Sequence, residues 1–274
     1  MMNEVQSILL IGGSDSSGGA GIQADCAVAR ACNVMPVCAV SCITSQGVGG
    51  LKMIMPVDEK IFSSQLSTAF EELHPAGVKI GMIPEEKLID ILIDKLALYH
   101  PANVVLDPVM APTSGRQDIC DEMWRNKSLY LRIAPFLDLI TPNIPEGLKI
   151  VDAQCEITTE ESLKKLATCI KSQCDFKGVL LKGGHLVSEI LVDCLCSGDE
   201  GNLTLFHHPA VNTRNTHGTG CALATSIVCN LIKGVPLATA CNNAIDTLYK
   251  SLVGNKNTVF FSNPAAAGPA FFEI

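Results

Sequence analysis

Residues 7–25, SILLIGGSDSSGGAGIQAD, contain an apolar run, a loop rich in glycine and serine, and the start of a helical pattern. An apolar run that leads through glycines into a helix is typical of a strand, loop and helix at a parallel sheet. So many small residues let a ligand approach the backbone closely. The stretch therefore predicts an α/β fold with a ligand site after its first strand, and a flexible turn without a ligand is the alternative interpretation.

Short apolar runs alternate with helical patterns along the rest of the chain, which favours βαβ units and a mainly parallel sheet. The expected strands are residues 7–11, 36–43, 77–80, 103–106, 137–140 and 179–181. The expected helices between them are residues 24–31, 60–73, 84–98 and 159–173. Several strands are apolar throughout, as burial on both faces of a sheet requires.

The alternation of strand and helix patterns ends after residue 188. Residues 189–196 and 203–208 have strand character and are joined by a turn with two glycines, which predicts a hairpin at the edge of the sheet. Two helices follow, at about residues 219–233 and 236–253. With no repeat and no long linker in 274 residues, we expect one domain over residues 1–274.

Composition excludes several classes of protein. The 20 basic against 28 acidic residues give a net charge of −8, which provides no basic stripe for nucleic acid. The 13 cysteines are an odd number in a chain without a basic leader, so we expect reduced thiols in the cytoplasm. No C-x-x-C or H-E-x-x-H pattern indicates zinc, and no run of 18 apolar residues indicates a membrane span.

A second glycine-containing loop, residues 215–224 (NTHGTGCALA), precedes an apolar helix. Backbone N–H groups at a helix start attract a negative oxygen, and the hydroxyl of Thr219 would add a donor. Cys221 lies in the first turn, where a thiol pKa falls below about 8.5. The sequence therefore predicts an anion site with a reactive thiol, and a buried helical cysteine is the alternative for Cys221.

A dinucleotide site is the competing interpretation of the first loop. Residues 19–24 (GAGIQA) fit a loose G-x-G-x-x-A pattern, but they begin several residues after the strand. The zone about 20 residues further on, residues 41–46, contains no acid to bind a ribose. A Walker A loop is absent from the sequence, so phosphate must be held in another way.

Together, residues 13–25 and 215–221 resemble the two signature regions of the phosphomethylpyrimidine kinase family. The resemblance continues in family order through TSQ (residues 44–46), VKIGM (78–82), VVLDPVM (104–110), ITPNIPE (140–146) and LKGGH (181–185). It implies a ribokinase-like three-layer α/β/α sandwich with a mainly parallel central sheet and an antiparallel edge hairpin. It also implies that the two glycine-rich loops meet at one site.

The resemblance assigns a role to each motif. It implies that Gly13, Asp25, Gln46 and Met82 bind the pyrimidine, where carboxylate and amide groups suit a flat polar ring. A surface acid and an ordinary loop residue are the alternatives for Asp25 and Gln46.

The phosphate side has its own set of implied residues. Asn143, Lys182 and Thr219 would bind ATP and its phosphates, Asp107 and Glu146 would organise Mg²⁺, and Gly218, Thr219, Gly220 and Cys221 would be catalytic. Asp107 follows an apolar strand, at the sheet edge where open α/β sheets bind ligands. A turn-initiating cap is the alternative for Asp107, and a surface lysine is the alternative for Lys182.

The implied activity is ATP-dependent phosphorylation of 4-amino-5-hydroxymethyl-2-methylpyrimidine and its monophosphate in thiamine biosynthesis. The main alternative is a pyridoxal or pyridoxine kinase of the same fold, although residues 111–115 (APTSG) lack the cysteine that some dual-specificity relatives carry. A non-catalytic pyrimidine sensor is a further alternative, and a sugar kinase fits less well. Relatives usually form homodimers, and a candidate dimer contact in this chain is the pair Phe271 and Phe272.

Overall fold

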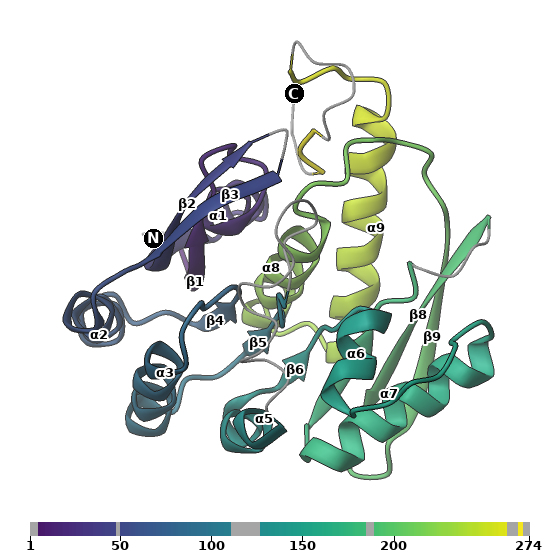
Figure 1. Cartoon of the computed structure of the whole chain (residues 1–274), viewed down its shortest axis with the longest axis horizontal. Coiled ribbons are helices and arrows are strands. Elements are labelled where there is room, and N and C mark those ends of the chain that lie inside the picture. Colours follow the sequence, from purple (N-terminus) through teal and green to yellow (C-terminus); the bar gives the residue numbers. More distant parts are fainter. Residues whose placement is uncertain (1–4, 48–49, 111–126, 185–188, 262–267, 271–274) are drawn as a thin grey trace.

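The computed structural model describes residues 5–47, 50–110, 127–184, 189–261 and 268–270, so Phe271 and Phe272 lie outside it. Within these residues one sheet has nine strands in the order β3-β2-β1-β4-β5-β6-β7-β8-β9 (Figure 1). The strands are β1 Ser7–Ser14, β2 Met35–Gly47, β3 Gly50–Pro56, β4 Gly77–Ile80, β5 Val104–Leu106, β6 Leu139–Ile140, β7 Gly178–Leu181, β8 Ile190–Ser197 and β9 Asn202–Pro209.

Helices cover both faces of this sheet. They are α1 Gly21–Ala31, α2 Glu59–Thr68 with a π-helical turn at Ala69–Leu73, α3 Glu86–Tyr99, α5 Lys127–Ile133, a 3-10 turn at Ala134–Phe136, α6 Ile144–Ile150, α7 Glu160–Cys174, α8 Thr219–Ile232 and α9 Leu237–Asn255. None of these described helices is both long and apolar enough to cross a membrane.

The core consists of two apolar layers, one on each face of the sheet. Leu9 and Ile11 of β1 pack in the layer formed with α2, α3, α5, α6 and α7. Ile8 and Leu10, which point to the opposite face, pack in the layer formed with α1, α8 and α9. This confirms the predicted three-layer α/β/α sandwich with apolar strands buried on both faces (Figure 1).

The strand directions also follow the prediction. Strands β2, β1, β4, β5, β6 and β7 pair in parallel, and β8 and β9 form the predicted antiparallel hairpin. Thr159 caps α7, and Asn143 caps α6 through a reciprocal capping box with Glu146.

The sequence did not predict β3, α5 or α6. Strand β3 pairs antiparallel with the second half of β2, which is longer than expected. Met53 and Met55 on β3 are 71% and 60% exposed, so no alternation of buried and polar residues marks this strand. Helices α5 and α6 have seven residues each, too short for a clear helical period.

The parallel strands all end at one edge of the sheet, and the predicted site residues follow those ends. Met82 comes two residues after β4, and Asp107 comes directly after β5. Asn143 and Lys182, which follow β6 and β7, form an isolated parallel bridge. The carboxyl edge of a parallel sheet is where open α/β folds bind ligands, so we expect the site there.

Candidate functional site

The two glycine-rich loops touch each other, as expected from the sequence. A Cβ atom on Gly19 would lie 2.5 Å from Cδ2 of His217, and a Cβ on Gly218 would lie 2.1 Å from the carbonyl oxygen of Gly19. Gly218 also has a φ of +82°, which disfavours any side chain. The glycines therefore allow a close approach of two segments that are about 200 residues apart in the sequence.

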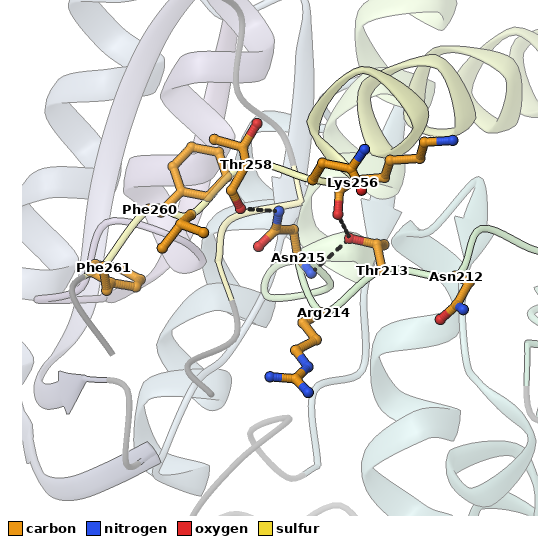
Figure 2. Close-up of a pocket in the computed structure, with 10 residues that line it drawn as sticks. Asn212, Thr213, Arg214, Asn215, Lys256, Thr258, Phe260 and Phe261 are labelled. Atoms are coloured by element: carbon orange, nitrogen blue, oxygen red, sulfur yellow. Dashed lines mark hydrogen bonds between the residues drawn. The ribbon is translucent and has the colours of Figure 1, made fainter. Parts of the chain in front are cut away.

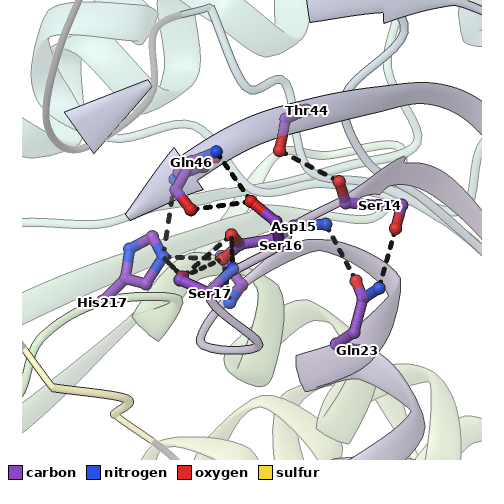
Figure 3. Close-up of polar contacts among 9 residues, drawn as sticks. Ser14, Asp15, Ser16, Ser17, Gln23, Thr44, Gln46 and His217 are labelled. Atoms are coloured by element: carbon purple, nitrogen blue, oxygen red, sulfur yellow. Dashed lines mark hydrogen bonds and ion pairs between the residues drawn. The ribbon is translucent and has the colours of Figure 1, made fainter. Parts of the chain in front are cut away.

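Polar contacts hold the two loops together (Figure 3). Nε2 of His217 lies 2.8 Å from Oδ2 of Asp15, and the side chain of His217 is 11% exposed. The same carboxylate accepts hydrogen bonds from the backbone N–H groups of Ser17 and Ala20 and from the hydroxyl of Ser17. Asp15 thus organises the first loop and ties it to the second loop through His217.

The ionised carboxylate of Asp15 is expected to stabilise the fold, and this contribution should be lost at acidic pH. Burial alone would raise its pKa, but the hydrogen bonds from His217 and Ser17 outweigh burial and lower the pKa from 3.8 to about 2. A depressed carboxyl pKa adds stability above pH 3.8 that is lost as the pH falls toward 2. We expect Asp15→Asn to lower the free energy of unfolding by about 2 kcal/mol at pH 7, measured by urea unfolding.

The difference in the free energy of unfolding between Asp15→Asn and the unchanged chain should become smaller as the pH falls from 4 to 2. Asp199→Asn, at an exposed position in the β8–β9 turn, is the control and should leave stability unchanged. A difference for Asp15→Asn that is constant over this pH range would contradict a role for the ionised carboxylate.

Residues predicted to bind the pyrimidine gather beside the first loop. A Cβ on Gly13 would lie 2.8 Å from Cε of Met82, so these two residues are in contact. Gln46 is held to the loop by Ser16, whose hydroxyl donates to the Gln46 carbonyl at 2.7 Å and accepts from the Gln46 N–H at 2.8 Å. Nε2 of Gln46 also lies 3.5 Å from Nε2 of His217. An amide and an apolar sulfur side chain thus each lie against the first loop, and these residue types suit a flat polar ring.

Asp25, the fourth residue of this predicted group, is fully buried and engaged within the protein. Its Oδ2 accepts from Nζ of Lys79 at 2.7 Å, and its Oδ1 accepts from the hydroxyl of Thr225 at 2.7 Å. Lys79 and Thr225 were not predicted as site residues. A lysine within the buried strand GVKI was the sequence signal for this pair, because a buried ammonium requires a partner.

Charged side chains surround the start of α8. Nζ of Lys182 lies 3.0 Å from Oδ1 of Asp107, and Thr141 donates to the same oxygen at 3.2 Å. A Cβ on Gly220 would lie 3.1 Å from Oδ2 of Asp107 and 3.3 Å from Nζ of Lys182. The lysine side chain is 18% exposed, so it can still meet a ligand. A cation, a carboxylate and a helix N-terminus thus meet at one point.

Glu146 completes the charged group. Its Oε2 accepts from the N–H of Asn143 at 2.8 Å. Burial raises the pKa of Glu146 to about 7, Lys182 opposes that rise, and Asp107 adds to it by repulsion. A divalent cation would relieve the repulsion between these two carboxylates, and oxygen ligands suit Mg²⁺. Among the described residues no three His, Cys, Asp or Glu side chains converge on a metal, so water would supply the remaining ligands.

The prediction of a lowered Cys221 pKa is wrong. Burial raises the pKa of this thiol to about 11, although the charge of Lys79 and a hydrogen bond from the N–H of Gly21 act in the opposite direction. Its place in the first turn of α8 is as predicted. Helix position alone therefore did not determine the pKa, because the loss of hydration has the larger effect.

A cavity of about 260 Å³ lies next to the second loop, between residues 212–215 and residues 256–261 (Figure 2). Asn215 fixes its wall by donating to the carbonyl oxygens of Asn255 at 2.6 Å and Thr258 at 3.0 Å. Arg214, Lys256 and Phe260 also line the cavity. The sequence has no family motif after Gly254, so residues 256–261 had no predicted role.

Comparisons with known proteins identify the family to which the chain is similar. A family model described as phosphomethylpyrimidine kinase matches residues 15–262. A hydroxymethylpyrimidine/phosphomethylpyrimidine kinase of Haemophilus influenzae is 35% identical over 264 residues, with 92% of each chain covered. The enzyme of the same description from Escherichia coli is 34% identical over 219 residues, with 80% of each chain covered.

Solved structures show the same fold. A phosphomethylpyrimidine kinase from Clostridium difficile has a TM-score of 0.76 at 30% identity, and the match covers 91% of this chain and 100% of that one. An ADP complex of Bacillus subtilis pyridoxal kinase has a TM-score of 0.84 at 26% identity, with 97% of each chain covered.

Proposed function

The chain belongs to the phosphomethylpyrimidine kinase family and is a phosphotransferase, and from this premise we propose its substrates and the roles of its residues. The proposed reaction is transfer of the γ-phosphoryl group of ATP to 4-amino-5-hydroxymethyl-2-methylpyrimidine. A second transfer, to the phosphate of the monophosphate product, would follow in thiamine biosynthesis. The observation that carries the proposal is the position of Asp107 and Lys182 against Gly220 at the start of α8.

Phosphoryl transfer depends mainly on positioning and on stabilisation of negative charge. The N–H groups of residues 218–221, at the positive end of α8, would bind the transferring phosphoryl group, together with the hydroxyl of Thr219. Lys182 would neutralise phosphate charge, and Asn143 lies beside it through the bridge between the two segments. Asp107 and Glu146 would hold Mg²⁺ through oxygen atoms and water, and the bound ion would supply charge stabilisation for the phosphates.

The pyrimidine would lie over the first loop. Gln46 would hydrogen-bond the ring, and Gly13 and Met82 would form its apolar contact. The nucleoside of ATP would occupy the cavity beside Asn215, because the cavity wall leads within a few residues into the N-terminus of α8. We propose a cytoplasmic location, because the odd number of 13 cysteines favours reduced thiols over a disulfide framework.

Arg214 is expected to contribute to ATP binding, since it lines this cavity and carries a positive charge. We expect Arg214→Ala to raise the KM for ATP about tenfold, the effect of one charged contact, with little change in kcat. Steady-state kinetics with varied ATP would measure this. Arg132→Ala, which removes an exposed arginine paired with Asp90 on α3, is the control. An unchanged KM for ATP would place the nucleoside elsewhere.

Cys221 is proposed as the general base that accepts the proton of the substrate hydroxyl. With a pKa of about 11, its thiolate fraction rises tenfold per pH unit over the neutral range. We therefore expect kcat to increase with pH between 6 and 9, and Cys221→Ala to lower kcat about 10²-fold and to abolish the slope. Cys221→Asp should retain part of the activity. Near-normal turnover of Cys221→Ala would refute the base assignment but not the kinase assignment.

The function is tested by measuring ADP release from Mg·ATP with hydroxymethylpyrimidine and with pyridoxal at equal concentrations. A preference for the pyrimidine is expected. A preference for pyridoxal would favour the activity named for the B. subtilis structure, and pyrimidine binding without ADP release would indicate a sensor.

The proposed quaternary structure is a homodimer. Ile43 of β2 pairs with Met55 of β3. The side chains of Ile43, Met53 and Met55 are at least half exposed, so they provide an apolar surface for a second copy of the chain. Sedimentation of the unchanged chain and of Met53→Glu would test this, with a monomeric unchanged chain as the contrary result.

A further inference from the structure

A buried ionic contact joins three elements beneath the site. Nζ of Lys79 on β4 lies 2.7 Å from Asp25 on α1, and Thr225 on α8 donates to the other carboxylate oxygen at 2.7 Å. The side chains of Lys79 and Asp25 are 1% and 0% exposed. Burial alone would lower the pKa of Lys79, but the attraction of Asp25 outweighs it and raises the pKa, so the ammonium stays charged.

This contact lies one helical turn below Cys221. Thr225 follows Cys221 by four residues on α8, and Asp25 follows Gly21 by four residues on α1, so each pair shares a helix face. The N–H of Gly21 bonds the sulfur of Cys221 at the upper level, and Thr225 bonds Asp25 at the lower level. The N-termini of two helices are thereby fixed side by side.

We propose that Asp25, Lys79 and Thr225 form a positioning unit that holds the first turns of α1 and α8 in register around Cys221, and that none of the three contacts the substrate. This inference rests on the proposed function. It replaces the role in the pyrimidine pocket that the family resemblance implied for Asp25, because both carboxylate oxygens are already bound within the protein.

The ionic character of the unit has a consequence beyond packing. Apolar side chains would join two helices equally well without the cost of removing charges from water. The charged groups that act on the Cys221 thiol are Asp25 of α1, Lys79 of β4, Asp107 after β5 and Lys182 after β7. Lys79 favours the thiolate and Asp25 opposes it, so the unit sets the charge balance at this sulfur.

Removal of the Thr225 hydroxyl is the smallest change that tests this proposal. We expect Thr225→Val to lower kcat about tenfold and to leave the KM for the pyrimidine unchanged, since one hydrogen bond to a charged group is lost. Ser226→Ala is the matched control, because Ser226 is the adjacent buried residue of α8 and its hydroxyl has no hydrogen-bond partner among the described residues. A raised pyrimidine KM with unchanged kcat would overturn the proposal and return Asp25 to the substrate pocket.

The second test measures alkylation of Cys221 by iodoacetamide without substrate, so it does not depend on kinase activity. We expect Lys79→Met to slow alkylation several-fold and Asp25→Asn to accelerate it, because the two charges have opposite effects on the thiolate. Cys229 is buried in the fold and lies in the same tryptic peptide as Cys221, so it serves as the internal reference. Equal rates in both variants, or changes in the same direction, would refute the proposal even if the kinase assay succeeds.

A separate observation concerns Cys26 and Cys38, whose sulfur atoms on α1 and β2 lie 3.4 Å apart. Cys38 is exposed and also lines an open groove beside α2. The hydrogen bond from Cys38 lowers the pKa of Cys26. An accessible thiol pair with one acidic member is the arrangement that thiol–disulfide exchange requires.

We propose that Cys26 and Cys38 form a disulfide when the protein meets a small-molecule disulfide such as oxidised glutathione. One protein thiolate would attack the small disulfide and release one thiol. The other would then displace the second thiol, so two protein thiols are oxidised and one disulfide is reduced. The sulfur atoms must approach from 3.4 Å to about 2.05 Å, a movement that side-chain rotation and a small backbone shift would provide.

Peptide mapping of the full chain after incubation with oxidised glutathione would test this. We expect a Cys26–Cys38 cross-link and a mass loss of about two hydrogens per chain, both abolished in Cys38→Ser. The pair Cys32 and Cys229 is the control, because Cys229 is buried and should stay reduced. Stable glutathione adducts on Cys26 or Cys38 without a cross-link, or no reaction, would refute the proposal.

Discussion

Replacing Lys182 by methionine is expected to lower kcat about 10³-fold. The ammonium lies 3.0 Å from Asp107 and beside Gly220, where the proposed phosphoryl group gathers negative charge in the transition state. The carboxylates of Asp107 and Glu146 raise the pKa of Lys182 against the opposing effect of burial, so the charge is present at neutral pH. Methionine preserves much of the side-chain volume and removes only the charge and the donors.

Loss of Lys182 also leaves Asp107 without its cation, so folding must be measured together with activity. Lys182→Arg keeps the charge and should retain more activity than the methionine variant. Lys177→Met is the matched control, because Lys177 forms a comparable 3.1 Å contact with Asp138 at an exposed position. A Lys182→Met enzyme that is folded by circular dichroism and has unchanged kcat would contradict the phosphate role.

Gly218→Ala is expected to lower kcat/KM by at least 10²-fold and to destabilise the fold by several kcal/mol. The new methyl group would lie 2.1 Å from the carbonyl oxygen of Gly19, and neither backbone segment can rotate away as a side chain could. The loops would separate, and the N–H groups at the start of α8 would move relative to Asp107 and Lys182. Kinetics and urea unfolding would measure both effects.

The variant Gly234→Ala separates the strain of a positive φ from the steric clash between the two loops. Gly234 also has a positive φ, of 76°, but a methyl group there would meet nothing within 4 Å. It should therefore show the backbone strain of about 1 kcal/mol without a loss of activity. If the Gly218 and Gly234 variants were equally stable and equally active, contact between the loops would have no part in the site.

The place of several candidate site residues in the fold could be predicted, because these residues lie at positions defined by local sequence. Asp107, Asn143 and Lys182 each follow an apolar strand, and parallel strands bring their carboxyl ends to one edge. Gly218 and Gly19 are in motifs whose glycines indicate close approach of backbone or ligand. These inferences need only strand direction and residue type.

Other parts could not be predicted because they depend on neighbours that are remote in the sequence. His217 was part of a quoted motif, but its partner Asp15 lies 202 residues away. Strand β3 is partly exposed and has no distinctive period, so only its pairing with β2 defines it. The contacts of Asp25 with Lys79 and Thr225 depend on the packing of α1, β4 and α8.

The sequence by itself determined the α/β class, the mainly parallel direction of the central strands and the position of the two glycine-rich loops in the chain. These follow from hydrophobic period and backbone freedom, which are properties of short segments. Only the tertiary structure decided the direction of the Cys221 pKa shift and the pairing of Asp25 with Lys79. Hydration and charge at a side chain depend on every group packed around it, and short segments carry no information about that environment.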